Sequence, residues 1–547
     1  MKTVHEVSSN KLRGGFYTPA PLVDMCLDRV AALWGPAENL RVLEPSAGDG
    51  VFLRRLARHP LATQIGSFTG LEIVEAEAAK CRSLAQDTAF PSTICTTSAV
   101  SWATIATDKF DVVVGNPPFV RFQFVSPNDV NATKQLGLAM GVSFRGVTNL
   151  WVPVLLGALH HLRAGGVMAV VVPAEVLTGL ASGDARAWLL ANFTDLQIDL
   201  FEPGSFPDVL QEIVIISGRK ANRAQGSLRS STRLDFVEHL GVHVRHRWTH
   251  GLPHTSESWT RYLLTPDQLA ALAAARKLSG VQRFGDVAKL EVSIVTGAND
   301  FFSVTAEECE RFQLHQWTEP LLPRIRYADE LVYAAADHAR TAASGAKAWL
   351  LNFSAQRPDP RAVAGPARYL DIGELQGLDT RYKTALRSPW YRVPAVWSGT
   401  LLLSKRSHRF PRLVYNAAQV VTTDTIYRGS ILPLYVGREM DLVAAFHNSL
   451  TLLTAEVEGR SFGGGVLELV PSEIARLTVP FPVDLTDAIP QLRQFARMTG
   501  TSATTQELLV EKTDSVLCDR LAGLTPDLMQ LIQEARWSLL SRRLSRN

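Results

Sequence analysis

The stretch "VLEPSAGDGVFL", Val42 to Leu53, decides the fold of the first part of this chain. Its beginning is strand-forming, its middle is a glycine-containing loop, and its end favours a helix. Because glycine has no Cβ atom, such a loop lets a ligand approach the backbone and the start of a helix closely. The stretch lacks the GxGxxG of a dinucleotide site and the Gly-Lys-Ser/Thr of a phosphate-binding loop. We therefore expect a strand–loop–helix unit that binds a different kind of ligand.

Strand-like and helix-like segments alternate around this unit, from about residue 40 to 220. Such alternation predicts a parallel sheet that is covered by helices on both faces. The expected strands cover residues 40–44, 67–72, 110–115 and 167–173, and the expected helices include residues 51–59 and 149–166, the second ended by its glycines.

Two later strands, at residues 196–201 and 212–220, have no helix between them and are expected to pair antiparallel at an edge of the sheet. A parallel sheet with one late hairpin is typical of class I methyltransferases. The polar stretch 221–255 is interpreted as a linker, residues 260–480 as a second domain of mixed or mostly β character, and the chain from about residue 484 as helical.

The composition describes a folded protein of two or three domains, with 547 residues, 46% apolar and 20% charged. A net charge of +3 is too small to argue for nucleic acid by itself, so a basic patch must be found locally. The 5 cysteines are scattered and never form CxxC, which favours a reducing compartment without a zinc site. No signal core or membrane-length apolar run is present, so we expect a cytoplasmic protein.

Carboxylates surround the expected ligand loop. Glu44 ends its strand, Asp49 lies in the loop, and Glu72 ends the next strand in "GLEI". These groups would repel a pyrophosphate but suit a ligand with an ammonium and a sulfonium, such as S-adenosylmethionine. A carboxylate at the position of Glu72 can accept hydrogen bonds from both ribose hydroxyls.

A second loop follows the apolar strand in "FDVVVGNPPFVR", residues 110–121. Ligands of an open parallel sheet lie beyond the C-terminal ends of its strands, where this loop is expected. Asn116 offers an amide oxygen, Pro117 and Pro118 fix the backbone and leave carbonyl oxygens free, and Phe119 offers a flat face. Together they suit an amino group on a planar ring. Two oxygen acceptors would draw its nitrogen towards a tetrahedral shape, so that direct methyl transfer needs no metal or covalent intermediate.

In the order of these motifs the chain resembles the gamma-class N6-adenine DNA methyltransferases of type II restriction–modification systems, the TaqI-like group. "GGFYTPAPLVDMCL" (14–27), "EPSAGDG", "GLEI" and "NPPF" follow one another as in that family. Further on, "SIVTGANDFF" (293–302) and "GRSFGGGVLELVPSE" (459–473) are similar to segments of its recognition domain. The resemblance covers most of the chain. It implies a class I S-adenosylmethionine-dependent α/β sheet with a late antiparallel hairpin, a mixed α/β target-recognition domain and a helical tail, over residues 1–240, 241–480 and 481–547.

The resemblance also implies roles for individual residues. Thr18 would contact the cofactor carboxylate and Glu72 would hold the ribose. Phe206 would help to clamp the extruded base; its alternative is a loop phenylalanine packed on the core. The methionine moiety would lie along Glu44, Pro45, Ser46, Ala47 and Gly48. The target adenine would be held by Asn116, Pro117 and Phe119, with Pro118 beside the cofactor.

Two positions depart from the family pattern. Where the family commonly has Asp to read the adenine of the cofactor, this chain has Ser98, whose hydroxyl is a weaker acceptor. Where the family has an aromatic residue in the helix after NPPF, this chain has Val154.

A basic and aromatic stretch at residues 381–416 contains no acidic residue and is typical of nucleic-acid surfaces. Its cations are Arg381, Lys383, Arg387, Arg392, Lys405, Arg406, Arg409 and Arg412, and its aromatic residues are Tyr382, Trp390, Tyr391, Trp397, Phe410 and Tyr415. The alternative is a solvated basic face with core aromatics. Arg536, Arg542, Arg543 and Arg546 of the tail could equally contact phosphate or end a solvated helix.

The sequence therefore predicts a monomeric enzyme that uses S-adenosylmethionine to methylate the N6 amino group of a flipped-out adenine in double-stranded DNA. This would protect the DNA from a restriction endonuclease encoded separately. Two alternatives stay open: an N4-cytosine DNA methyltransferase, which usually carries Ser in place of Asn116, and an inactive methyltransferase fold that serves as a DNA-binding specificity protein. A cytosine-C5 enzyme is excluded because no cysteine follows a proline as a nucleophile would.

Overall fold

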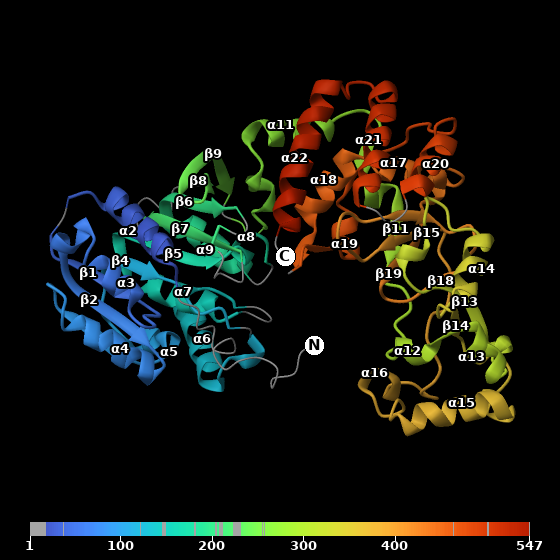
Figure 1. Cartoon of the computed structure of the whole chain (residues 1–547), viewed down its shortest axis with the longest axis horizontal. Coiled ribbons are helices and arrows are strands. Elements are labelled where there is room, and N and C mark those ends of the chain that lie inside the picture. Colours follow the sequence, from blue (N-terminus) through green and yellow to red (C-terminus); the bar gives the residue numbers. More distant parts are fainter. Residues whose placement is uncertain are drawn as a thin grey trace. The chain divides into compact units, whose positions relative to one another are not determined.

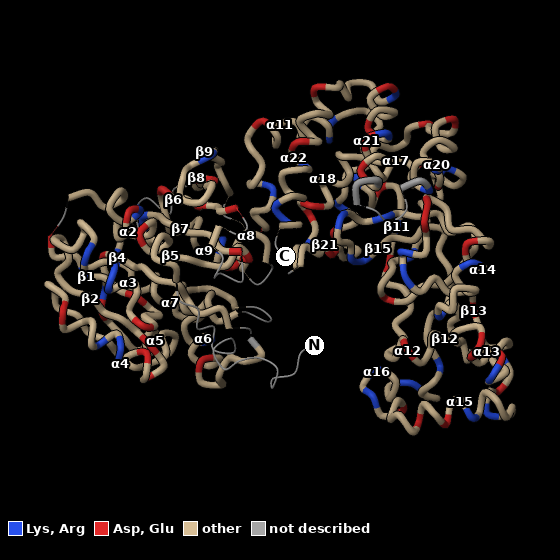
Figure 2. The backbone as a smooth tube through the Cα atoms, viewed as in Figure 1, with Lys and Arg blue, Asp and Glu red and all other residues tan. Residues whose placement is uncertain are grey.

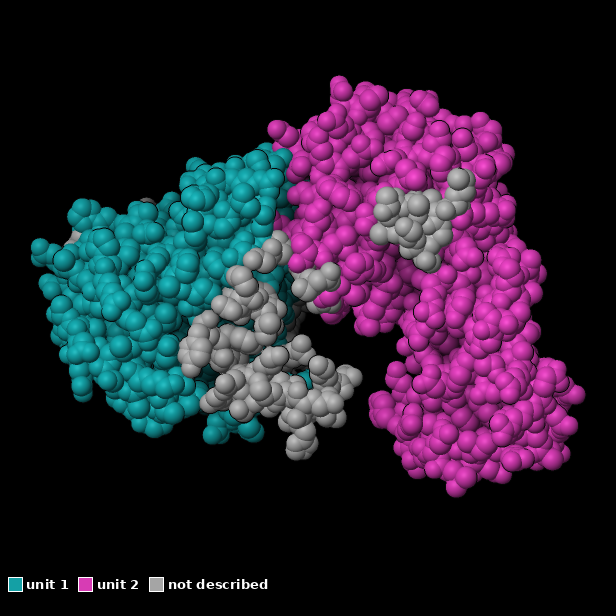
Figure 3. Space-filling view, in the orientation of Figure 1, with its two compact units in different colours: residues 1–266, 546 teal, residues 267–545, 547 magenta. Residues whose placement is uncertain are grey.

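The computed structural model forms two compact units, residues 1–266 and 267–545, which Figure 3 colours separately. The structure describes residues 18–36, 38–120, 122–144, 149–179, 182–202, 205–206, 212–222, 231–253, 255, 257–462, 464–499 and 503–545. The boundary predicted at residue 240 falls between two strands of the first unit, and the division into three functional domains stays a prediction.

A 9-stranded sheet organises the first unit, in the order β3-β2-β1-β4-β5-β7-β6-β8-β9 (Figure 1). The first five strands are parallel, and β7 is antiparallel to both β5 and β6. This confirms the class I methyltransferase sheet with its late hairpin. The strands are β1 (Leu40–Glu44), β2 (Ile65–Glu72), β3 (Ser92–Thr96), β4 (Phe110–Gly115), β5 (Leu162–Pro173), β6 (Phe193–Phe201), β7 (Ile213–Lys220), β8 (Ser231–Leu240) and β9 (His243–Pro253).

Helices cover this sheet because side chains alternate between its two faces. Val112 and Val114 of β4 join the core beneath α2 and α3, while α5, α6 and α7 form another cluster around Val100, Leu136 and Val154. The helices are α2 (Ala20–Trp34), α3 (Val51–Leu56), α4 (Glu75–Ala85), α5 (Ala99–Ile105), α6 (Pro127–Met140), α7 (Trp151–His160), α8 (Glu175–Thr178) and α9 (Gly183–Asn192).

The helix expected at residues 149–166 is shorter than predicted. Helix α7 ends at His160, and β5 begins at Leu162, so that Gly165 and Gly166 lie in a strand. Gly165 has a φ of 75°, and a Cβ on Gly166 would lie 2.9 Å from the carbonyl oxygen of Asp111. These glycines therefore permit a close approach and an irregular register between β4 and β5, and they do not end the helix.

The linker expected at residues 221–255 is also wrong, because β8 and β9 occupy residues 231–253 and extend the sheet. The hairpin of β6 and β7 is consequently not at an edge, since β6 pairs with β8 on its other side. Thr232, Leu234 and Phe236 alternate into the core, a two-residue period that the many polar residues of this stretch conceal.

A buried carboxylate joins the first helix to these added strands. Asp199 of β6 is 0% exposed and accepts hydrogen bonds from Arg29 of α2 at 2.6 and 3.1 Å. His239 of β8 lies 2.7 Å from the same carboxylate. Burial would raise the pKa of Asp199, but hydrogen bonds from His239 and Arg29 hold it below its usual value. The group therefore stays ionised and binds α2, β6 and β8 together.

The second unit is mixed α/β, as predicted, with strands in separate small sheets and a helical end. Its strands are β10 (Val281–Arg283), β11 (Ala288–Glu291), β12 (Ser303–Val304), β13 (Thr318–Leu322), β14 (Trp349–Leu351), β15 (Leu401–Ser404), β16 (Arg406–Ser407), β17 (Leu413–Tyr415), β18 (Val421–Thr422), β19 (Ile426–Ile431), β20 (Arg460–Phe462), β21 (Val466–Glu468) and β22 (Thr478–Pro480). Its helices are α11 (Pro266–Ala275), α12 (Asn299–Phe302), α13 (Ala306–Arg311), α14 (Ala335–Ala343), α15 (Ala364–Leu375), α16 (Tyr382–Ala385), α17 (Glu439–Phe446), α18 (Ser449–Glu458), α19 (Pro471–Ile474), α20 (Ile489–Thr499), α21 (Ala503–Arg520) and α22 (Pro526–Leu544).

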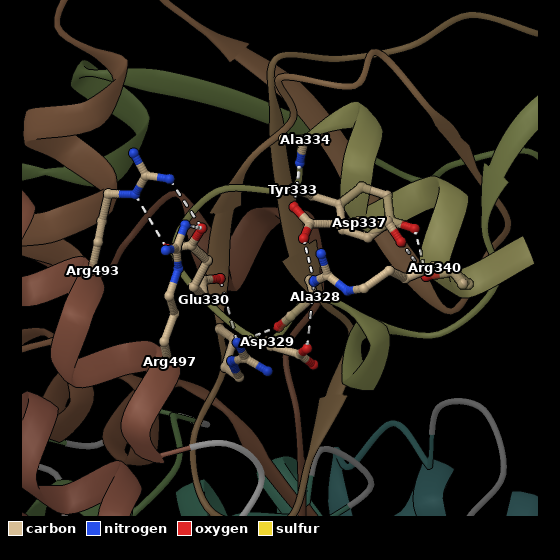
Figure 4. A network of polar contacts seen from close by, with 11 residues as sticks. Ala328, Asp329, Glu330, Tyr333, Ala334, Asp337, Arg340, Arg493 and Arg497 are labelled. Carbon is tan, nitrogen blue, oxygen red and sulfur yellow. Dashed lines mark hydrogen bonds and ion pairs between the residues drawn. The ribbon is translucent and has the colours of Figure 1, made fainter. Parts of the chain in front are cut away.

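Helix α20 is tied to the body of this unit by Glu330, whose carboxylate receives two guanidinium groups (Figure 4). Arg493 donates to both carboxylate oxygens at 3.0 and 3.2 Å, and Arg497 donates to one at 2.8 Å. Burial would raise the pKa of Glu330, but these two arginines lower it below 4.5. The helical end is therefore packed into the second unit by charge-assisted hydrogen bonds.

We expect Glu330→Gln to lower the stability of the second unit by about 1–3 kcal/mol, because the arginines lose their charged acceptor. Since folding lowers the pKa of Glu330, its contribution is present above pH 4.5 and is lost as the pH falls through the lowered value. Calorimetry of the variant and the wild type between pH 3 and 7 measures this difference. Glu307→Gln, at an exposed position of α13, is the control; an equal effect of both substitutions at pH 7 would contradict the assignment.

Candidate cofactor and target-base site

The loop between β1 and α3 is held by backbone contacts and by Glu72. The Ala47 N–H donates to the Leu71 carbonyl at 2.8 Å, and the Gly48 N–H donates to Glu72 Oε2 at 2.9 Å. The other oxygen of Glu72 accepts from the Val74 N–H at 2.8 Å, at the start of α4. Glu72 thus positions the loop through one oxygen and, through the other, the residue that precedes α4.

The loop after β4 lies directly against this first loop. Gly115 has a φ of 148°, and a Cβ at this position would lie 3.2 Å from the Pro45 ring. The Ser46 hydroxyl donates to the backbone carbonyl of Asn116 at 2.9 Å. The sheet therefore brings together two predicted groups, Pro45–Ser46 and Asn116–Phe119, although they lie about 70 residues apart in the chain.

The Asn116 side chain is oriented by Thr18, which precedes α2. Its amide nitrogen donates to the Thr18 hydroxyl at 3.0 Å, which leaves the amide oxygen on the other side of the group. The oxygen Oδ1 is buried and receives no hydrogen bond from any residue that the structure describes. A buried acceptor without a donor is costly unless a ligand supplies the hydrogen. Asn116 is therefore oriented to accept a hydrogen bond from a bound group.

The other residues of the second loop differ in exposure. Pro117 is buried, Pro118 is half-buried, and Phe119 is half-buried with its ring packed on the core cluster of α2 and α3. Residues Gly14 to Tyr17, from the motif before Thr18, and Arg121, at the end of the NPPF stretch, lie outside the described residues.

Glu44 gives the first loop a strongly acidic environment. Its side chain is 1% exposed, and its Oε2 has no hydrogen-bond donor among the described residues. Burial raises the pKa of Glu44 well above 4.5, and the carboxylates of Asp49 and Glu72 raise it further. A cationic ligand would relieve both the desolvation and the repulsion. The acidic set and the unpaired oxygens of Glu44 and Asn116 therefore fit S-adenosylmethionine, which carries an ammonium and a sulfonium.

Ser98 begins α5 and is engaged by a residue that the sequence analysis did not single out. Its hydroxyl donates to Asp129 of α6, and its oxygen accepts from the Ser101 N–H at 3.4 Å. Asp129 is buried and also accepts from the Ser126 hydroxyl at 2.8 Å. No sequence pattern predicts this contact, because Ser98 precedes α5 and Asp129 lies in α6. Val154, at the other departure from the family, is a core residue.

Phe206 packs on the core next to β6. Its ring meets Phe201 edge-on, with the centroids 5.2 Å apart, and Phe201 stacks on His239 at 5.3 Å. Phe206 is half-buried against the same core cluster as Phe119. The core packing raised as its alternative is thus present, and the exposed part of the ring leaves the role in clamping a base as a prediction.

The cations of the basic stretch divide into two groups. Arg387 donates to backbone carbonyls, Arg406 pairs with Glu468, Arg409 pairs with Glu507, and half-buried Arg412 donates to the Ala328 carbonyl. Among the described residues, none forms a hydrogen bond or an ion pair with the side chains of Arg381, Lys383, Arg392 and Lys405. This second group has no competing acid among the described residues and is therefore the more available for phosphate.

In the tail, Arg536 pairs with Glu507 and Arg543 with Glu456, both nearly without exposure, so these two are structural. Arg542 also has a partner, and Arg546 lies outside the described residues. Over the part of the chain that is described, no helix is long and apolar enough to cross a membrane.

Two family models match the chain. Residues 71–205 match the Eco57I restriction-modification methylase, and residues 256–517 match the type II methyltransferase M.Eco57I, C-terminal domain. This chain is related to the type II restriction–modification methyltransferases. The type II methyltransferase M.AccI of Acinetobacter calcoaceticus is 23% identical over 486 residues, 84% of each chain. M.XamI of Xanthomonas campestris pv. amaranthicola is 22% identical over 489 residues, 85% of each.

The chain is also similar to solved structures. The type IIG restriction endonuclease BpuSI matches 97% of this chain and 66% of its own, with a TM-score of 0.42 and 14% identity. A DrdV–DNA complex matches 90% of this chain and 58% of its own, with a TM-score of 0.49 and 12% identity. The chain thus spans at most about two thirds of these two structures.

We expect Glu44→Gln to act in opposite directions on stability and on ligand binding. Because folding raises the pKa of Glu44, its ionisation costs stability as the pH rises above 4.5, so the variant gains stability without ligand at pH 7.5. Its affinity for S-adenosylmethionine falls by roughly 10- to 100-fold, because a charged acceptor is lost. Thermal unfolding and titration calorimetry measure the two effects, and exposed Glu38→Gln is the control. Loss of stability together with unchanged binding would make Glu44 a structural residue only.

Proposed function

We propose that this chain transfers a methyl group from S-adenosylmethionine to the N6 amino group of an adenine flipped out of double-stranded DNA. The observation that carries the proposal is the buried Oδ1 of Asn116, which has no donor among the described residues while the amide nitrogen donates to Thr18. An amide oxygen placed at the C-terminal edge of a parallel sheet, beside an acidic loop, suits an amine donor next to a cationic ligand.

The chemistry needs an activated amine, because the lone pair of adenine N6 is delocalised into its ring. Asn116 Oδ1 would accept one amine hydrogen and the Pro117 carbonyl oxygen the other, which localises the lone pair on nitrogen. The cofactor supplies an electrophilic methyl group on a sulfonium. The nitrogen would form its bond to the methyl carbon as the carbon–sulfur bond leaves its electron pair on sulfur, and the amine would then lose one proton to water. Phe119 would stack on the base and hold the amine in line.

The remaining predicted residues surround the same site. Glu44, Pro45, Ser46, Ala47 and Gly48 would line the methionine end of the cofactor, with Thr18 near its carboxylate. Glu72 would approach the ribose, although both its oxygens already accept backbone hydrogen bonds, and further hydrogen bonds there use their remaining lone pairs. Ser98 would approach the adenine of the cofactor, with its hydroxyl proton donated to Asp129 and one lone pair left beside the hydrogen bond that its oxygen accepts from Ser101. Phe206 would clamp the target base.

The relatives named above are type II methyltransferases, which supports DNA as the substrate and a protective role beside a separately encoded restriction endonuclease. We also infer a monomer that acts in the cytoplasm.

Asn116→Ala is expected to reduce methyl transfer by roughly 100- to 1,000-fold, because one of two acceptors for the amine is removed. DNA binding is expected to persist, since no phosphate contact is altered. Sequencing plasmid DNA from expressing cells, with detection of modified bases, identifies the base and the sequence, and tritium transfer to duplex DNA measures the rate. Asn131→Ala, at an exposed position of α6, is the matched control.

The wild type decides between the candidate functions in the same experiment. If the plasmid contains N4-methylcytosine, the target base is cytosine and not adenine. DNA binding without any methyl transfer would favour the inactive specificity protein.

A further inference from the structure

Helix α16 presents an unusual surface within the basic stretch. Tyr382 is 81% exposed and Leu386 is 75% exposed, whereas Trp390 and Phe410 of the same stretch are buried and Trp397 is 39% exposed beneath Arg428. Arg381 and Lys383 flank Tyr382, are exposed, and have no partner among the described residues. We call Arg381, Tyr382, Lys383 and Leu386 the α16 tip. Large exposed apolar side chains close to cations that form no ion pair are typical of a binding surface.

The α16 tip is fixed from behind. The Arg387 guanidinium donates to the carbonyls of Val295 and Thr296 at 2.9 and 2.8 Å. Gly297, with a φ of 80°, allows α16 to approach so closely that a Cβ there would lie 3.0 Å from the Lys383 Cβ. Thr384 is fully buried, and its hydroxyl donates to the Leu378 carbonyl. Side chains on such an anchored backbone lose little conformational freedom on binding.

The loop that receives Arg387 is itself anchored. The Ala298 N–H donates to the Thr296 hydroxyl at 3.1 Å, and Asn299 donates to Asp424 at 3.0 Å. The segment "SIVTGANDFF", similar to part of the family's recognition domain, therefore acts as the platform for the α16 tip. Figure 1 places α16 beside α12, which begins in this segment.

We propose that the α16 tip contacts duplex DNA, with Arg381 and Lys383 on phosphates and Tyr382 and Leu386 on the edges of bases. Charge complementarity supports this occupant, because no acidic residue occurs between Asp379 and Asp424 (Figure 2). Phosphate contacts set affinity and salt dependence, and base contacts set the sequence that is read. The inference rests on the proposed function, of which it specifies the DNA-reading element.

The two halves of the tip give different expected effects. Arg381→Glu with Lys383→Glu weakens binding to every duplex at least tenfold and lowers the slope of log K against log salt by about 2, since each phosphate contact contributes about 0.9. Tyr382→Ala with Leu386→Ala changes the affinity for a random 30-base-pair duplex by no more than about twofold. The same variant either binds the sequence that the enzyme methylates at least tenfold more weakly or methylates a wider set of sequences.

Fluorescence anisotropy of the full chain between 50 and 200 mM salt measures affinity, with random duplexes and with the sequence found by plasmid sequencing. Lys277→Glu with Lys289→Glu makes the same change in net charge at exposed positions elsewhere in the second unit and serves as the control. Thermal unfolding verifies the fold of each variant, and Arg381→Ala with Lys383→Ala replaces the charge reversal if that variant is unstable.

Wild-type affinity and salt slope in the Arg381/Lys383 variant, or an effect equal to that of the control, would overturn the proposal. An unchanged methylated sequence and affinity in the Tyr382/Leu386 variant would overturn base contact. If the wild type transfers no methyl group, the proposed function fails, but binding to the random duplex still tests the contact with DNA.

Discussion

The contact between two loops at one edge of the first sheet is the constraint on which the candidate site depends. Ser46 holds the backbone of Asn116, Gly115 lets the loops approach, and Thr18 orients the Asn116 amide. These three contacts leave one acceptor oxygen buried, and none of the residues that the structure describes donates to it. A rigid, unsatisfied acceptor is costly in a protein without a ligand, and for that reason it is informative about what the protein binds.

Charge completes the same arrangement. Glu44 is held in a buried position beside Asp49 and Glu72, where its ionisation is opposed by burial and by like charge. Glu72 is the partly compensated member, because it accepts two backbone hydrogen bonds. Elsewhere in the first unit, buried Asp199 is fully compensated by Arg29 and His239 and only stabilises the fold. A buried carboxylate that is paired with cations is structural. A buried carboxylate without such a partner is a candidate for binding a ligand.

In the second unit, the same reasoning about partners sorts the cations. Half-buried Arg412 donates to a backbone carbonyl and buried Arg543 to a carboxylate, and both hold parts of the second unit together. Arg381 and Lys383 have no such role among the described residues, and α16 carries them on a backbone that Arg387 fixes. Whether an arginine stabilises the fold or can bind a ligand therefore depends on its partner. The number of basic residues in a stretch of sequence does not decide this.

The sequence alone determined the strands up to β7 except β3, the two ligand loops and the acidic character of the first loop. These follow from local patterns, since apolar runs and glycine-containing turns act over a few residues. It missed β8 and β9, whose apolar period is hidden among polar residues, and it took Gly165 and Gly166 as the end of a helix. Only the tertiary structure decided the partners: that Asn116 meets Thr18, that Ser98 meets Asp129, and which arginines of residues 381–416 are free. Such contacts join residues far apart in the chain, and they exist only when the packing of the sheets and helices brings those residues together.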